Sequence, residues 1–141
     1  MLAESFLDTN VLVYAAAGRE SEEHKREQAL ALIEREDVGL SAQVLQEFYV
    51  TVTRKLEVPL SPVQALEWIE QLESFPCVAV DSGLVKIAAE ASERFQISYW
   101  DGAILSAAQV LGAATLYTED LNDGQRYGPV RVVNPFRSVG G

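Results

Sequence analysis

Four acidic residues that lie far apart in the sequence are the first candidates for chemistry: Asp8, Glu47, Asp101 and Asp120. Each stands where an apolar stretch of strand or helix character begins or ends. Two carboxylates about 5 Å apart repel by roughly 3 kcal/mol at an effective dielectric constant of about 20, so a gathered set needs a cation. Hard oxygen ligands without thiols or available imidazole select Mg²⁺ or Mn²⁺ over Zn²⁺. Gathered by the fold, these acids predict a metal site suited to phosphodiester chemistry.

Each of these acids also has a purely structural interpretation. Asp8 can cap the helix that follows it, and Asp101 completes a Ser-x-x-Asp pattern typical of a capping box. Glu47 alone is typical of a solvated helix position. Glu119 competes with Asp120 for the fourth acidic place, and the sequence leaves that choice open. The coincidence of the four acids, more than any one of them, favours a functional site.

Short apolar segments alternate with longer helical patterns along the chain. The expected strands cover residues 5–9, 38–41, 77–80, 114–118 and 131–133. The expected helices cover residues 10–16, 22–36, 41–56, 63–72 and 99–111, and a further helix, capped by Asp81 or Ser82, contains residues 85–95. This alternation indicates an α/β domain with three α/β/α layers and a mostly parallel central sheet of about five short strands. The carboxyl ends of parallel strands share one edge of a sheet, so the topology predicts that all four acids meet there.

Length and composition indicate one folded domain over residues 1–141. Hydrophobic residues make up 48% and charged residues 23% of the chain, which is typical of a globular protein rather than a disordered one. The N-terminus lacks the pattern of a signal peptide, and no apolar run approaches the roughly 18 residues of a membrane span. We therefore expect a cytoplasmic protein that does not enter the membrane.

Several classes of site are excluded or disfavoured. Cys77 is the single cysteine, which excludes an intramolecular disulfide, and His24 is the single histidine, in a charged helical segment, which disfavours a histidine-based mechanism. The 11 Lys and Arg residues against 21 Asp and Glu residues give a net charge of −10, the wrong sign for a generic nucleic-acid binder. That charge weighs less against an enzyme that contacts phosphate through a bound metal.

The motifs together resemble those of the PIN-domain ribonucleases, especially the VapC-like toxins of bacterial and archaeal toxin–antitoxin pairs. The resemblance covers essentially the whole chain. It is carried by Asp-Thr-Asn at 8–10, the lone Glu47, Tyr-Trp-Asp at 99–101, Thr-Glu-Asp-Leu at 118–121 with a following Asp-Gly, and Asn-Pro-Phe at 134–136.

The resemblance implies an activity, a cofactor and partners. The activity is endonucleolytic cleavage of RNA by water, dependent on Mg²⁺ or Mn²⁺. The implied catalytic residues are Asp8, Glu47, Asp101 and Asp120, of which Asp8, Asp101 and Asp120 would bind the metal, with Asn10 and Thr118 as polar helpers and Asp123 as an outer acid. The implied partners are the RNA substrate, a cognate antitoxin and a second copy of the chain.

Two alternatives stay open at this point. The first is a non-enzymatic, flavodoxin-like phospho-receiver with Asp81 as the acceptor, although no lysine follows Lys86 to serve such a site. The second is a PIN-like domain used only for assembly.

Overall fold

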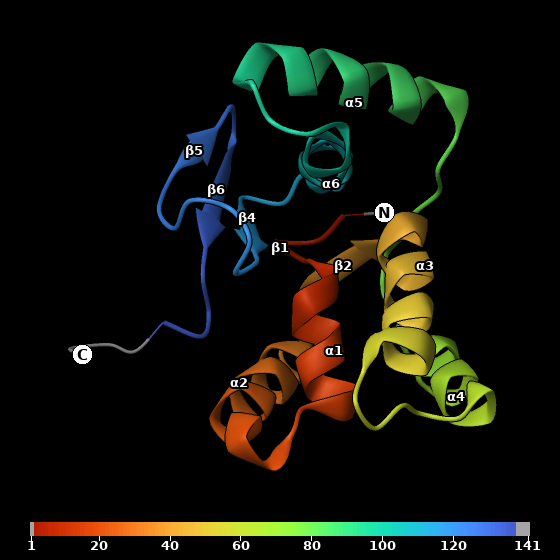
Figure 1. The fold of residues 1–141 in the computed structure, drawn as a ribbon. Helices are drawn as coiled ribbons and strands as arrows, with labels where there is room; N and C mark the ends of the chain where they lie inside the picture. Colours follow the sequence, from red (N-terminus) through yellow and green to blue (C-terminus); the bar gives the residue numbers. More distant parts are fainter. Residues whose placement is uncertain (1, 138–141) are drawn as a thin grey trace.

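A single mixed sheet forms the centre of the computed structural model, which describes residues 2–137 (Figure 1). Its strands are β1 (Ser5–Leu7), β2 (Val38–Ser41), β3 (Cys77–Val78), β4 (Thr115–Tyr117), β5 (Arg126–Tyr127) and β6 (Val130–Val133). They lie in the order β3-β2-β1-β4-β6-β5, and every neighbouring pair is parallel except β5 and β6. The expected mostly parallel sheet is confirmed.

Helices cover both faces of this sheet. They are α1 (Thr9–Ala17), α2 (Glu23–Glu34), α3 (Ala42–Val50), α4 (Pro62–Leu72), α5 (Ser82–Phe95) and α6 (Tyr99–Val110). A 3₁₀ turn, η1 (Glu20–Glu22), precedes α2, and a π-helical turn, η2 (Thr51–Lys55), extends α3. Helix α6 packs on one face with α5 outside it, while α1 to α4 lie on the other, which gives the predicted three layers (Figure 1).

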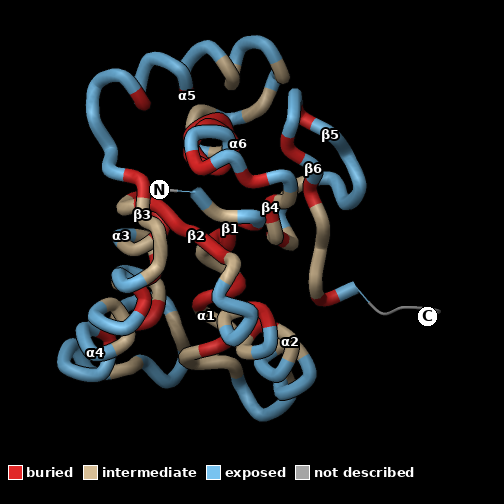
Figure 2. Tube along the Cα trace, turned by 180° about the vertical axis from the view of Figure 1, so that it is seen from behind, coloured by how far each residue is buried: buried red, intermediate tan, exposed pale blue. Residues whose placement is uncertain are grey.

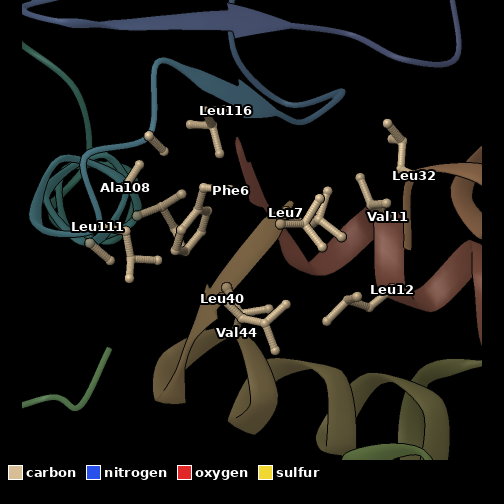
Figure 3. Close-up of a cluster of buried hydrophobic side chains, with 14 of the residues drawn as sticks. Phe6, Leu7, Val11, Leu12, Leu32, Leu40, Val44, Ala108, Leu111 and Leu116 are labelled. Atoms are coloured by element: carbon tan, nitrogen blue, oxygen red, sulfur yellow. The ribbon is translucent and has the colours of Figure 1, made fainter. Parts of the chain in front are cut away.

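The core lies on both sides of β1, because successive strand residues point to opposite faces. Phe6 points towards α6, whereas Leu7 points towards α1, and both side chains are fully buried (Figure 3). Seven consecutive residues of α6, from Gly102 to Ala108, are buried, as expected for a helix that is apolar almost all round. A Cβ atom at Gly102 would lie 2.7 Å from the carbonyl oxygen of Ala88, so α5 and α6 approach closely only because Gly102 has no side chain.

Figure 2 shows that the buried residues gather in the strands and α6, whereas the outer sides of α2, α4 and α5 are exposed. Among the described residues, no helix is both long and apolar enough to cross a membrane. Residue 1 and residues 138–141 of the predicted single domain lie outside the described part of the chain.

Two details of the predicted sheet are corrected. The sheet has six strands in the described residues, not about five, because residues 126–127 pair with β6 across a turn that begins at Gly128, whose φ of +61° favours glycine. Strand β3 ends at Val78 rather than Val80, and Val80 is 48% exposed.

The topology also argues against the phospho-receiver. In the flavodoxin-like order the third strand lies inside the sheet, whereas β3 here lies at its edge. Asp81 caps α5, because its Oδ1 accepts a 2.8 Å hydrogen bond from the Leu84 backbone N–H. That contact gives Asp81 the ordinary role of an N-cap.

Candidate active site

Asp8 lies between the carboxyl end of β1 and the first turn of α1. Its backbone N–H donates to the Tyr117 carbonyl over 3.1 Å, which ties the end of β1 to the end of β4. Its Oδ1 accepts from the Thr9 N–H at 2.7 Å, so the expected capping role is present. Its Oδ2 accepts from the Thr118 hydroxyl at 2.8 Å. Only 7% of Asp8 is exposed, so this capping carboxyl group is buried rather than solvated.

Thr118, fully buried at the end of β4, joins three other residues. Besides donating to Asp8, its Oγ1 accepts from Asn10 Nδ2 at 3.0 Å and from the Asp120 N–H at 3.1 Å. Asn10 Nδ2 also donates to Asp120 Oδ2 at 3.1 Å. Asp8, Asn10, Thr118 and Asp120 therefore form one hydrogen-bonded group at the carboxyl ends of β1 and β4, which we call the Asp8 cluster.

Glu47 reaches the edge of this cluster from α3. Its Oε2 accepts from the Thr9 hydroxyl at 2.9 Å, and its Oε1 accepts from Gln43 Nε2 at 2.9 Å. The sequence interpretation missed Gln43, which is only 7% exposed. Its one sequence signal is the spacing of four residues to Glu47, which places both side chains on the same face of α3.

The pKa of Asp8 reflects its burial and the nearness of two other acids. Burial raises the pKa of Asp8 from its ordinary 3.8 to about 6, although the hydrogen bonds from Thr118 and Thr9 lower it, and the charges of Asp120 and Glu47 raise it further. Within residues 2–137, none of these acids forms an ion pair. The cluster thus holds two carboxylates, with that of Glu47 at its edge, and no basic partner among the described residues.

Asp101 stands apart from these three acids in its contacts. It lies in the first turn of α6, where its N–H donates to the capping Ser98 hydroxyl at 3.0 Å. Its carboxylate has no hydrogen bond to Asp8, Glu47 or Asp120 in the described part of the chain. The pKa of Tyr127 is raised, first by burial and then by the charge of Asp101. The structure therefore joins three of the four predicted acids by contacts and leaves Asp101 unbonded beside β5.

The three acids near the end of the chain, Glu119, Asp120 and Asp123, have different hydrogen-bond partners. Glu119 accepts from Tyr14 OH at 2.7 Å and pairs with Lys25 Nζ at 3.2 Å, so Asp120, not Glu119, belongs to the Asp8 cluster. Asp123, expected as an outer acid, instead accepts from the Asn134 N–H at 2.8 Å and from Arg137 at 2.9 Å. These two contacts hold the pKa of Asp123 below its usual range. Its carboxylate binds the C-terminal segment.

An open cleft of about 1290 Å³ lies against the cluster. Thr9, Asn10, Glu47 and Asp120 line it from the site. Apolar side chains continue it between α1 and η2, namely Val13, Ala17, Val50, Leu56, Val58 and Leu60. Trp100, one residue before Asp101, also lines it. A substrate in the cleft would contact the acidic side chains directly.

The residues of the cluster suit a divalent cation in their chemistry. All the candidate ligands are oxygen atoms, and Asn10 Oδ1 is a buried acceptor without a hydrogen-bond partner. Within the described residues, however, no three Asp, Glu, His or Cys side chains lie close enough to form a complete metal-binding group. Mg²⁺ commonly keeps several waters and takes only one or two carboxylates, so an incomplete protein shell fits its preferences.

Comparison with known proteins defines the class. A family model of the PIN domain matches residues 5–125, and the chain therefore belongs to the PIN domain family. A search of curated proteins found no match.

Solved structures show the same fold at low sequence identity. A toxin–antitoxin complex from Klebsiella pneumoniae has a TM-score of 0.69 at 19% identity, covering 93% of this chain and 97% of that chain. FitAB bound to a DNA fragment has a TM-score of 0.67 at 23% identity, covering 96% and 97%. Mycobacterium tuberculosis VapC20, described as a toxin that cleaves the sarcin-ricin loop, has a TM-score of 0.64 at 18% identity, covering 82% and 89%.

Proposed function

We propose that this protein is a cytoplasmic endoribonuclease that depends on Mg²⁺ or Mn²⁺ and acts as the toxin of a toxin–antitoxin pair. The observation that carries the proposal is the Asp8 cluster, in which buried and exposed carboxylates meet without a basic partner at the wall of an open cleft. Membership of the PIN domain family supports it, as does the likeness to toxins, one of which is described as cleaving the sarcin-ricin loop.

The proposed roles of Asp8, Asp120 and Glu47 follow from their hydrogen bonds, and that of Asp101 follows from the resemblance to the PIN-domain ribonucleases. Asp8 and Asp120 would bind the metal directly, with Asp101 approaching from α6 as the third ligand and Glu47 organising the site from α3. Thr118 and Asn10 hold the carboxylates of Asp8 and Asp120 in fixed orientations, as outer partners of metal ligands do. When bound, the cation would activate a water for in-line attack and stabilise the leaving oxygen.

The direct test compares two aspartates that both cap helices. Asp8→Asn should abolish RNA cleavage in Mg²⁺ or Mn²⁺, whereas Asp81→Asn should leave cleavage unchanged, because asparagine caps a helix about as well as aspartate. Cleavage should also stop in EDTA. An Asp8→Asn protein as active as wild type would contradict the catalytic assignment. A wild-type protein that cleaves no RNA would favour the assembly-only alternative.

The cleft also suits a cognate antitoxin. Its apolar stretch between α1 and η2 can take apolar side chains of a peptide segment, and its acidic end can take an Arg or Lys near Glu47 and Asp120. A basic side chain there would satisfy the carboxylates by charge-assisted hydrogen bonds and compete with the metal. The net charge of −10 would favour a partner with complementary potential.

The antitoxin proposal is tested by co-expression with the product of the neighbouring reading frame. Each basic residue of its toxin-binding segment is reversed in charge, and both complex formation and inhibition of RNA cleavage are measured. At least one reversal should release the nuclease activity. If every reversal leaves binding and inhibition intact, no basic side chain of the antitoxin occupies the acidic end of the cleft. Inhibition would then be steric or act from a distance.

Homodimerisation remains a proposal without an assigned interface. Val44 and Val52, two apolar residues of the α3–η2 segment, are fully buried in the core and so cannot form such a surface. On α4, Val63 is 65% exposed and Leu66 is 51% exposed, so this helix still offers an apolar surface. Sedimentation of the wild type against a Val63→Ser and Leu66→Ser double variant would show whether α4 takes part.

A further inference from the structure

Trp100 is a large aromatic side chain that the core does not use. It lies in the first turn of α6, is 64% exposed, and lines the same cleft as Asn10, Glu47 and Asp120. Seven residues that follow it in α6 are buried, so its exposure is a local feature of this turn. An aromatic ring at the wall of a cleft that contains the candidate acids is placed to contact whatever those acids act on.

The position of Trp100 is held from two sides. The ring of Tyr99 packs edge-on against it, with centroids 5.0 Å apart and an interplanar angle of 82°. The Trp100 carbonyl accepts a long, 3.5 Å hydrogen bond from Gln43 Nε2, the same amide group that donates to Glu47. These contacts orient the residue relative to the acidic site and leave much of the indole open.

The charge of the cleft favours an uncharged contact with RNA. Among the described residues, six acidic side chains line the cleft against two basic ones, Arg19 and Lys55. Arg19 is already engaged with Glu22 at 3.5 Å and Glu57 at 3.7 Å. Counterion release by Lys and Arg, the usual source of affinity for phosphates, is therefore weak here. Stacking of a base on an aromatic ring adds affinity without requiring positive charge.

We propose that Trp100 is a stacking surface for an unpaired base of the RNA substrate, next to the phosphate held at the acidic site. This inference rests on the proposed ribonuclease function. A base inside a duplex already has neighbours on both faces, so Trp100 would favour RNA segments whose bases are free to leave the stack. Trp100 is thus a specificity-determining residue, and the acids supply the chemistry.

Kinetics give the first test, on an unstructured RNA oligonucleotide in Mn²⁺. Trp100→Ala should lower kcat/KM by about five- to 150-fold, the range that about 1–3 kcal/mol per stacked base corresponds to, with the loss mainly in KM. Trp100→Phe should retain most of the activity because it keeps an aromatic face, whereas Trp100→Leu should not. Val110→Ala, at an exposed position near the other end of α6, is the matched control and should behave as wild type.

Fluorescence gives the second test, which needs no catalysis. The chain has two tryptophans, so a Trp68→Phe variant in an inactive Asp8→Asn background leaves Trp100 as the single reporter. The unpaired oligonucleotide should quench its emission, and the same sequence annealed in a duplex should quench it much less.

Either test can overturn the inference. Unchanged kcat/KM in Trp100→Ala, equal activity in the Phe and Leu variants, or equal quenching by both RNAs would each contradict stacking. Stacking would also be contradicted if Trp100→Ala lowered only the affinity for the antitoxin, since Trp100 would then be a contact with protein. If the wild type cleaves no RNA, the proposed function fails, and quenching by the unpaired oligonucleotide still decides the binding role.

Discussion

Glu119 and Asp120 are neighbours in the chain, yet their carboxylates lie in two different networks. Glu119 belongs to what we call the Lys25 network, in which Lys25 Nζ contacts Glu119 at 3.2 Å and Tyr14 OH at 3.1 Å. Lys25 also lies 4.7 Å from the ring centroid of Tyr14 and 5.8 Å from that of Phe136. Asp120 belongs to the Asp8 cluster, which contains no basic side chain.

The difference separates structural acids from candidate functional ones. In the Lys25 network every charge has a partner, and the contacts connect α1, α2 and the segment near Phe136, as a stabilising element does. In the Asp8 cluster a carboxyl group with 7% exposure has only neutral donors, and its pKa is raised to about 6. A perturbed buried group beside an open cleft is typical of an active site.

The largest expected effect comes from exchanging the two neighbouring acids for amides. Asp120→Asn should lower kcat/KM for RNA cleavage by about 100-fold or more, because a lost metal contact is worth several kcal/mol in the transition state. Glu119→Gln should keep nearly full activity, because its carboxylate serves Lys25. Equal losses of kcat/KM in the two variants would contradict the assignment of Asp120 to the active site and of Glu119 to a structural network.

Asp8 should make the free energy of unfolding depend on pH, by an amount similar to the catalytic effect of Asp120→Asn. In the folded chain Asp8 keeps its proton up to about pH 6, whereas the unfolded chain releases it near the ordinary 3.8. Between these values the folded state binds more protons, so rising pH lowers the free energy of unfolding, by up to about 3 kcal/mol from this group.

Urea unfolding in EDTA from pH 4 to pH 7 measures this effect. Asp8→Asn should remove the fall and be more stable than wild type at pH 7. Matching pH profiles for the two proteins would show that ionised Asp8 carries no such cost.

Thr118→Val tests the centre of the cluster with almost no change of shape. It removes the hydroxyl that donates to Asp8 and accepts from Asn10, and should lower the free energy of unfolding by about 1–3 kcal/mol and activity by about 10- to 100-fold. Thr53→Val is the control, since the Thr53 hydroxyl in η2 donates only to the Tyr49 carbonyl of the preceding turn in α3. The account of the cluster is wrong if both variants lose stability equally and keep full activity.

The smallest expected effect is the loss of stability when the Lys25 network is disrupted. Lys25→Met should lower the free energy of unfolding by about 0.5–1 kcal/mol, because the ion pair and the cation–π contact are partly exposed to solvent. Activity should be retained. Lys86→Met, at an exposed position on α5, is the control for loss of a positive charge. A collapse of activity in Lys25→Met alone would make the Lys25 network part of the site.

The sequence predicts the place of the site better than its contacts. Alternating strands and helices suffice to put Asp8 and Asp120 at one sheet edge, because the carboxyl ends of parallel strands share that edge. The choice between Glu119 and Asp120 depends on Lys25, which lies 94 positions from Glu119 and approaches it only in the folded chain. No local pattern carries that information.

Other features escaped prediction for equally physical reasons. Strand β5 has two residues, too few for an alternating pattern, and only the turn at Gly128 signals it. All four acids were expected at one sheet edge, but Asp101 lies in the first turn of α6, and within residues 2–137 no hydrogen bond links its carboxylate to the other acids. The sequence around Asp123 indicates only an acidic loop. Its pairing with Arg137 depends on the path of the C-terminal segment in the folded chain.

The central claim is that the Asp8 cluster binds a divalent cation, and thermal unfolding with millimolar Mn²⁺ against EDTA tests it most directly. A ligand that binds only the native state raises its stability by mass action. We predict a higher melting temperature with Mn²⁺ for wild type and for Asp81→Asn, and no rise for Asp8→Asn. An unchanged wild-type midpoint, or the same rise in Asp8→Asn, would contradict the claim.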